Sequence, residues 1–469
     1  MNNQNSKPIR KGVTGTKLVH YGPMWDESLQ VAGRGVGPVA VLVCHGMGQQ
    51  VRYETISSVA QIIRTEAELE GGTVSPVEVH LSQANDDFLA RAEINWTDPN
   101  KQQHQVHIYE AYWAPITEGK VNYWDTIKFL LRGAYNGFKY SVFRDTFNRW
   151  MFGGPKALRV GRLTPFGLLC VLLLLAVQIG IIGYVTLELA HQYKEVLSQP
   201  LPNVGTNGFL HTWFKWVAPL LPGINNVLNP VQGWYAWLVA LGWLLLWIAL
   251  IAEAFFVRYF IIEYVGDVAA YISPYKDSKF DEIRHQIQKI GFNVGKVIYG
   301  FGPALPTIPK YNKLVILGHS LGSVLAYDAL NALINLDNVS APADRRDVVG
   351  RTRALITFGS PLDKTAFIFR MQAGNSQDWI REQLVASVQP LIVNYANYRP
   401  EKTFTWVNIW SMMDIISGAL DYYDDPAVAD SDPRHVQNKG DWQAWIPLMA
   451  HVQYWKTELL RKQIYHYVS

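Results

Sequence analysis

The strongest structural signal in the chain is KLVILGHSLGSVLAYDAL, residues 313–330. The apolar run at 313–317 predicts a buried strand, and the run from Leu321 to Ile334 predicts a helix. The turn between them has the spacing G-x-S-x-G, with Gly318 and Gly322 on either side of Ser320. A strand–turn–helix with this spacing is typical of a nucleophile elbow, which holds the serine Oγ clear of the backbone at a helix N-terminus. A phosphate-binding loop is the alternative, and the turn lacks the spacing and the lysine of a P-loop.

The flanking sequence predicts more strands and helices of an α/β protein. Short apolar runs predict strands at Val39–Cys44, Val77–Leu81, Val106–Trp113, Ala354–Phe358 and Phe404–Trp410, with helices up to about Glu70 and over Tyr454–Tyr465. Buried parallel strands are continuous apolar runs of this kind, so the pattern indicates a mostly parallel sheet with helices on both faces.

A serine nucleophile needs a base, and in enzymes with this elbow the chain order is Ser, acid, His. Three histidines follow Ser320 at a distance: His435, His451 and His466. His451, in WIPLMAHVQYW, lies between an apolar segment and a predicted final helix, and we therefore favour it as the base. His435 is in a charged, proline-containing stretch, and His466 is almost at the terminus.

Two aspartates are candidates for the acid that orients the base. Asp414 follows the predicted strand FTWVNIW, and Asp363 follows the preceding one in FGSPLDK. We favour Asp414 and keep Asp363 as the alternative acid. For either residue the ordinary role is a turn or a helix N-cap.

The loop after the first strand, His45-Gly46-Met47-Gly48, is suited to an oxyanion hole. Such a site needs backbone N–H groups at the developing negative charge, and we expect them from Leu321 and Met47. Gly46 allows close approach of the loop, and His45 is expected to bond to nearby backbone as a structural residue. A plain glycine-rich turn is the alternative.

The middle of the chain differs from its flanks. Residues 165–187 and 234–252 have no formal charge, and each run has the length that a bilayer-spanning helix needs. Lysine and arginine are abundant before the first run and sparse in the 190–233 loop, so the positive-inside rule places both flanks in the cytoplasm. The alternative is a pair of buried core helices. The net charge of +3 is too small to indicate nucleic-acid binding.

With VLVCHGMGQ, VILGHSLGS, TFGSPLDK, WVNIWSMMDIISG and AHVQYW in this order, the chain resembles the lipase and esterase branch of the α/β-hydrolase superfamily. The resemblance covers roughly 37–117 and 290–469. It implies Ser320, Asp414 and His451 as a catalytic triad, with Met47 and Leu321 as backbone oxyanion donors.

These observations give the following expectations. The fold class is an α/β-hydrolase fold interrupted by a two-helix transmembrane insertion: a polar lead-in (1–24), the domain's first part (25–118), the insertion (119–289) and its second part (290–469). The function is a membrane-anchored serine ester hydrolase acting on lipid or other acyl-ester substrates, with no metal or cofactor. A thioesterase, an acyltransferase and an inactive membrane scaffold are the alternatives. The expected location is the inner membrane, multi-pass, with the hydrolase domain on the cytoplasmic side and membrane lipids, but no nucleic acid, as partners.

Overall fold

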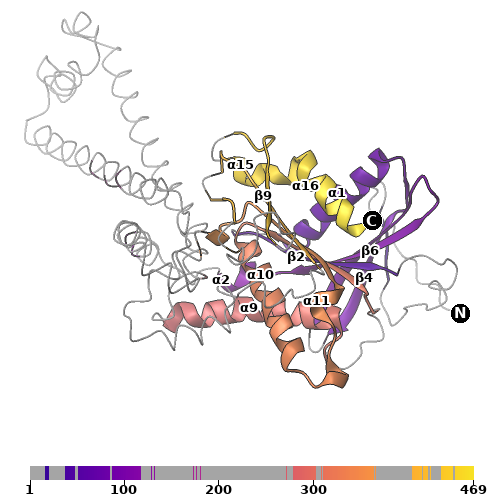
Figure 1. The fold of residues 1–469 in the computed structure, drawn as a ribbon, viewed down its shortest axis with the longest axis horizontal. Helices are drawn as coiled ribbons and strands as arrows, with labels where there is room; N and C mark the ends of the chain where they lie inside the picture. The colour runs from indigo at the N-terminus through magenta and orange to yellow at the C-terminus, as the bar shows by residue number, and fades with distance from the viewer. Residues whose placement is uncertain are drawn as a thin grey trace, which may run out of the picture.

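The computed structural model describes the chain in ten ranges and a few isolated positions. The ranges are 16–20, 37–47, 51–84, 87–117, 278–302, 310–363, 404–414, 416–420, 435–446 and 449–469. Within them the chain forms one mixed sheet with helices on both of its faces (Figure 1).

The sheet has ten strands in the described residues, in the order β1-β4-β5-β6-β2-β7-β8-β9-β10, with β3 paired to β5. Their bounds are β1 Thr16–His20, β2 Val39–Cys44, β3 Thr73–Val74, β4 Val77–Ala84, β5 Asp87–Thr97, β6 Gln103–Ala111, β7 Lys313–His319, β8 Thr352–Phe358, β9 Thr405–Trp410 and β10 Gln437–Gly440. The strands from β6 to β10 are all parallel, whereas β5 is antiparallel to both β4 and β6. The carboxyl ends of β2, β7, β8 and β9 therefore meet at one edge of the sheet.

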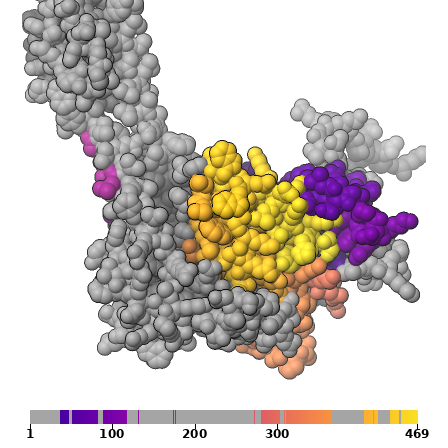
Figure 2. Space-filling view, turned by 45° about the horizontal axis from the view of Figure 1, so that its top comes forward, coloured from indigo at the N-terminus to yellow at the C-terminus, as the bar shows by residue number. Residues whose placement is uncertain are grey.

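Two layers of helices cover the sheet. The helices are α1 Glu54–Leu69, α2 Ala114–Thr117, α9 Ser278–Tyr299, α10 Leu321–Val339, α11 Val348–Arg351, α15 Ala450–Gln453 and α16 Glu458–Val468, with 3-10 turns η5 Pro342–Asp344 and η7 Tyr454–Lys456. Side chains alternate along each strand, so Leu42 and Ile316 pack with α9 and α10, while Val41 and Val315 pack with α1 and α16. Figure 2 shows the C-terminal segment against the early part of the chain, where Arg461 Nε lies 2.8 Å from Glu66 Oε2.

Some elements differ from those that the sequence indicates. β2 has the predicted bounds, but β1, β3, β5 and β10 were not predicted, and β1 lies within the range that we assigned to a polar lead-in. β5 has Arg91 and Glu93 at buried positions, where they form an ion pair that an apolar pattern does not reveal. β10, QNKG, is a polar strand at the sheet edge. α9 begins at Ser278, within the range that we assigned to the insertion, and packs against α10.

The predicted fold class is wrong in its transmembrane insertion. In the part of the chain that the structure describes, no helix combines the length and the apolarity that crossing a bilayer requires. The predicted spans, 165–187 and 234–252, lie outside the described residues apart from positions 173, 176 and 180. The predicted multi-pass location in the inner membrane is contradicted by the same finding. Apolarity over a helix's length is not specific to lipid, because α10 has its apolar side chains buried against the sheet.

Candidate active site

Ser320 lies in a strained turn between β7 and α10. Its φ of 52° and ψ of −131° are unusual for a non-glycine residue, and such backbone strain costs about 1–3 kcal/mol. The two flanking glycines make the turn possible. A Cβ on Gly318 would lie 2.4 Å from Ser323 Cα, and one on Gly322 would lie 2.2 Å from the carbonyl oxygens of Cys44 and His45. The strand, the helix and the β2 loop therefore approach more closely than any side chain allows.

The hydroxyl of Ser320 is hydrogen-bonded to His451, which comes from α15. The distance from Ser320 Oγ to His451 Nε2 is 2.7 Å, and His451 Nδ1 lies 3.0 Å from Asp414 Oδ2. Ser320 and Asp414 are buried, and His451 is partly exposed. The three residues named from the sequence therefore form a continuous chain of hydrogen bonds at the carboxyl edge of the sheet.

The carboxylate of Asp414 is held by groups besides His451. The backbone N–H of Ile416 donates to Oδ1 at 2.9 Å, and the Tyr454 hydroxyl donates to Oδ2 at 3.0 Å. Burial acts to raise the pKa of Asp414, but the hydrogen bond from His451 and the attraction of its ring outweigh it, and the pKa falls to about 2. Asp414 is thus an anion at neutral pH. Burial, together with the negative charge of Asp414, raises the pKa of Tyr454, which keeps its hydroxyl proton.

The alternative bases and acid lie elsewhere. Asp363 is buried in the turn after β8, but the acid at His451 Nδ1 is Asp414. His435 lies two residues before the start of β10, and His466 is exposed on α16. The structure therefore brings together the favoured base and acid and not their alternatives.

The loop after β2 lies directly against the elbow. A Cβ on Gly46 would be 3.0 Å from Ser320 Cβ, so only glycine gives this separation without a shift. Met47 follows it and is buried. His45 fixes the loop, because its Nδ1 is 2.8 Å from the Gly46 carbonyl oxygen and its Nε2 accepts the backbone N–H of Trp113 at 3.0 Å. Burial lowers the pKa of His45 to about 4, so it is neutral at pH 7.

Leu321 is the first residue of α10, and its N–H points out of the helix end where no carbonyl precedes it within the helix. The loop that holds Gly46 and Met47 lies beside this helix end and Ser320. A helix N-terminus also carries a partial positive charge. The arrangement is suited to stabilising an oxyanion formed at a carbonyl attacked by Ser320.

Two supporting residues were not identified from the sequence. Tyr454, which donates to Asp414 besides His451 and Ile416, lies three residues after His451, a spacing that places side chains on one helical face. Ser323 donates to the Ser320 carbonyl oxygen at 2.5 Å, and its Oγ is 2.6 Å from Ser360 Oγ. These contacts tie the elbow to the turn after β8.

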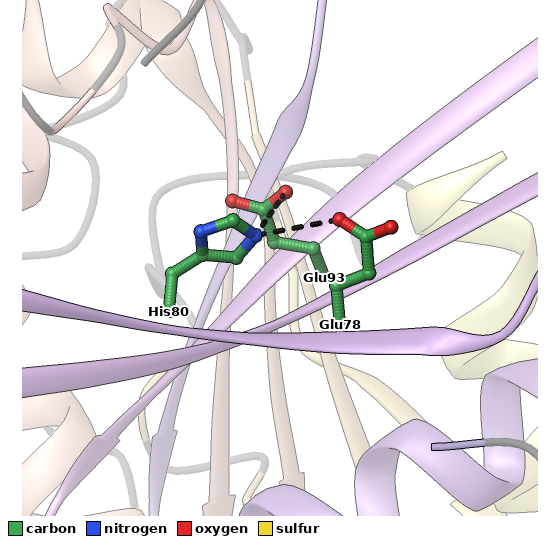
Figure 3. Close-up of side chains that lie close together, drawn as sticks. All are labelled: Glu78, His80 and Glu93. Atoms are coloured by element: carbon green, nitrogen blue, oxygen red, sulfur yellow. Dashed lines mark ion pairs between the residues drawn. The ribbon is translucent and has the colours of Figure 1, made fainter. Parts of the chain in front are cut away.

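One group in the described residues has the composition of a metal site. Glu78 and His80 on β4 face Glu93 on β5, with His80 Nε2 3.5 Å from Glu78 Oε2 and 3.4 Å from Glu93 Oε2 (Figure 3). Arg91 Nε lies 2.6 Å from the other oxygen of Glu93. This ion pair already compensates the buried carboxylate, and the group lies on the antiparallel strands, away from Ser320.

Comparisons with protein-family models, with curated proteins and with solved structures gave no match for this chain. The geometry of the site is therefore the basis on which a function is proposed.

Proposed function

We propose that this chain is a serine hydrolase that cleaves carboxylic esters through an acyl-enzyme on Ser320. The observation that carries the proposal is the uninterrupted hydrogen-bond sequence from Ser320 Oγ to His451 to Asp414. A serine hydroxyl becomes nucleophilic when a neighbouring base takes its proton, and the base in turn needs an acid that fixes its tautomer.

In the proposed reaction, His451 Nε2 accepts the proton of Ser320 as Oγ attacks the ester carbonyl. Asp414 accepts the Nδ1–H bond and stabilises the imidazolium that forms, since its own pKa of about 2 keeps it ionised. The N–H groups of Leu321 and Met47 stabilise the oxyanion. His451 then gives its proton to the leaving alcohol, and water releases the acid by the same steps.

Exposed apolar side chains support an ester with an apolar acyl group. Met412 and Met413 directly precede Asp414, and Met449 and Val452 flank His451; they are 73%, 48%, 54% and 50% exposed. Because they neighbour the proposed base and acid in the chain, we take them as candidates to contact an apolar acyl group of the substrate.

The test is labelling of the purified chain with a fluorophosphonate probe, which reacts with activated serines. Wild type is expected to be labelled and Ser320→Ala to be unlabelled. Ser340→Ala is the matched control, because Ser340 caps the opposite end of α10, and it should be labelled like wild type. A folded wild type that takes no label, or equal labelling of Ser320→Ala, would overturn the proposal.

A panel of p-nitrophenyl esters of increasing chain length then tests the substrate. We expect kcat/KM to rise from acetate to octanoate. A preference for acetate would contradict the apolar acyl group, and faster cleavage of the matching thioesters, or transfer to an added alcohol, would replace ester hydrolysis by thioesterase or acyltransferase activity.

A further inference from the structure

His319, the residue before the nucleophile, contacts the catalytic base and not the serine. It is the last residue of β7, and its side chain is buried. His319 Nε2 donates to the backbone carbonyl oxygen of His451 at 2.9 Å. In the G-x-S-x-G pattern His319 is one of the two variable positions.

The segment that carries His451 has little structure of its own. α15 is a helix of four residues, too short to be stable without tertiary contacts. Carbonyl groups in the last turn of a helix have no partner within the helix. The bond from His319 supplies one to His451 and ties α15 to the end of β7, directly before Ser320.

The ring of His319 is held by aromatic neighbours. It stacks on Phe358 with centroids 5.0 Å apart and meets Trp455 edge-on at 5.4 Å. The ring of His451 lies 5.2 Å away at an interplanar angle of 31°. These contacts fix the orientation of the imidazole, so its N–H has a defined direction toward the His451 carbonyl.

His319 is also neutral at pH 7. Burial, together with the repulsion from His451, lowers the pKa of His319 to about 3. A neutral ring donates through Nε2 and does not oppose the positive charge that the catalytic base acquires.

We infer that His319 is a positioning residue that sets the distance between His451 and Ser320 through the backbone of His451. This inference rests on the proposed function, since it concerns the base of the same reaction. His319 fits this position because it combines a flat ring with an N–H at its far end. Phenylalanine keeps the ring without the donor, and glutamine keeps a donor at similar reach without the ring.

The experiment compares His319→Phe and His319→Gln with wild type, using p-nitrophenyl butyrate and thermal unfolding. His319→Phe removes the donor to the His451 carbonyl, so the base is held less precisely against Ser320 and kcat should fall by about tenfold or more. KM should change less than about twofold, because the substrate does not contact this residue. His319→Gln should recover most of the lost kcat.

The control is His107→Phe, which removes another buried histidine, bonded to Tyr311 and remote from the elbow. It should lower Tm and leave kcat unchanged. If His319→Phe has the kcat of wild type, or if a folded His319→Gln is as impaired as His319→Phe, the hydrogen bond does not position the base. If His319→Phe does not fold, the kcat of His319→Gln decides: retention supports the inference and loss overturns it. A wild type without turnover overturns the proposed function itself, and this inference with it.

Discussion

Replacing Gly322 by alanine tests whether the close approach of α10 to the β2 loop holds the site together. The added Cβ would lie 2.2 Å from both the Cys44 and the His45 carbonyl oxygens. Carbon and carbonyl oxygen in close contact are ordinarily about 3.3–3.6 Å apart. Both oxygens belong to backbone, so the helix end and the loop must separate by about 1 Å to admit the methyl group.

This separation acts on stability and on the proposed chemistry. Overpacking of a well-packed contact costs about 1–3 kcal/mol, and we expect the free energy of unfolding to fall by that amount. Leu321 lies on one side of the contact and Met47 on the other, so the gap between the two proposed oxyanion donors widens. A misplacement of about 1 Å in an active site can cost about 10²-fold in rate, which is the loss of kcat expected here.

The assay measures Tm and kcat with p-nitrophenyl butyrate for Gly322→Ala and for Gly37→Ala. Gly37 precedes the same strand at its other end, and a Cβ there would meet nothing within 4 Å. The control should match wild type in both measurements. A Gly322→Ala variant with wild-type Tm and wild-type kcat would refute the reasoning, because the close contact would then have no consequence.

Three more predictions follow from the environment of the base. In the p-nitrophenyl butyrate assay, Asp414→Asn should lower kcat by about 10³–10⁴-fold, because His451 loses the partner that fixes its tautomer. The control Asp363→Asn should change kcat less than about twofold in the same assay. Tyr454→Phe removes a hydrogen bond to the Asp414 carboxylate and should lower kcat about tenfold; an unchanged value would show that the Ile416 N–H suffices. In urea titrations, lowering the pH from 7 to 5 should reduce the free energy of unfolding of wild type by about 2 kcal/mol more than that of His319→Gln. The reason is that the pKa of His319 is about 3 in the folded chain and about 6.5 in the unfolded chain, so the unfolded chain takes up the proton first as the pH falls. Equal pH dependence of the two proteins would contradict a buried, neutral His319.

The parallel strands near the site could be predicted because each is a short apolar run that ends in a distinctive loop. VAVLVC predicts β2 with its observed bounds, and GHSLG after KLVIL predicts the turn at Ser320. His451 and Asp414 were selected by chain order and because each follows an apolar segment. Residues that follow buried parallel strands are expected at the carboxyl edge of the sheet.

Other features depend on contacts that a linear pattern does not contain. The burial of Arg91 in β5 is compensated by Glu93, so the strand has charged residues facing the interior. The hydrogen bond from His319 joins positions 132 residues apart. The transmembrane insertion was predicted from two uncharged runs of bilayer-spanning length and from the lysine and arginine on their flanks, and no helix in the described residues has that length and apolarity.

The strand order shows how the two parts of the domain pair in one sheet, and this pairing does not depend on the length of the segment between them. β2, from the first part, is hydrogen-bonded between β6 and β7, and α2, where the first part ends, contacts α9, where the second begins. The chain therefore leaves and rejoins the domain at neighbouring points. Each doubling of a connection between such points adds only about 0.6 kcal/mol of closure entropy. The length of the connection between α2 and α9 therefore has little effect on the closure entropy of the domain that holds the triad.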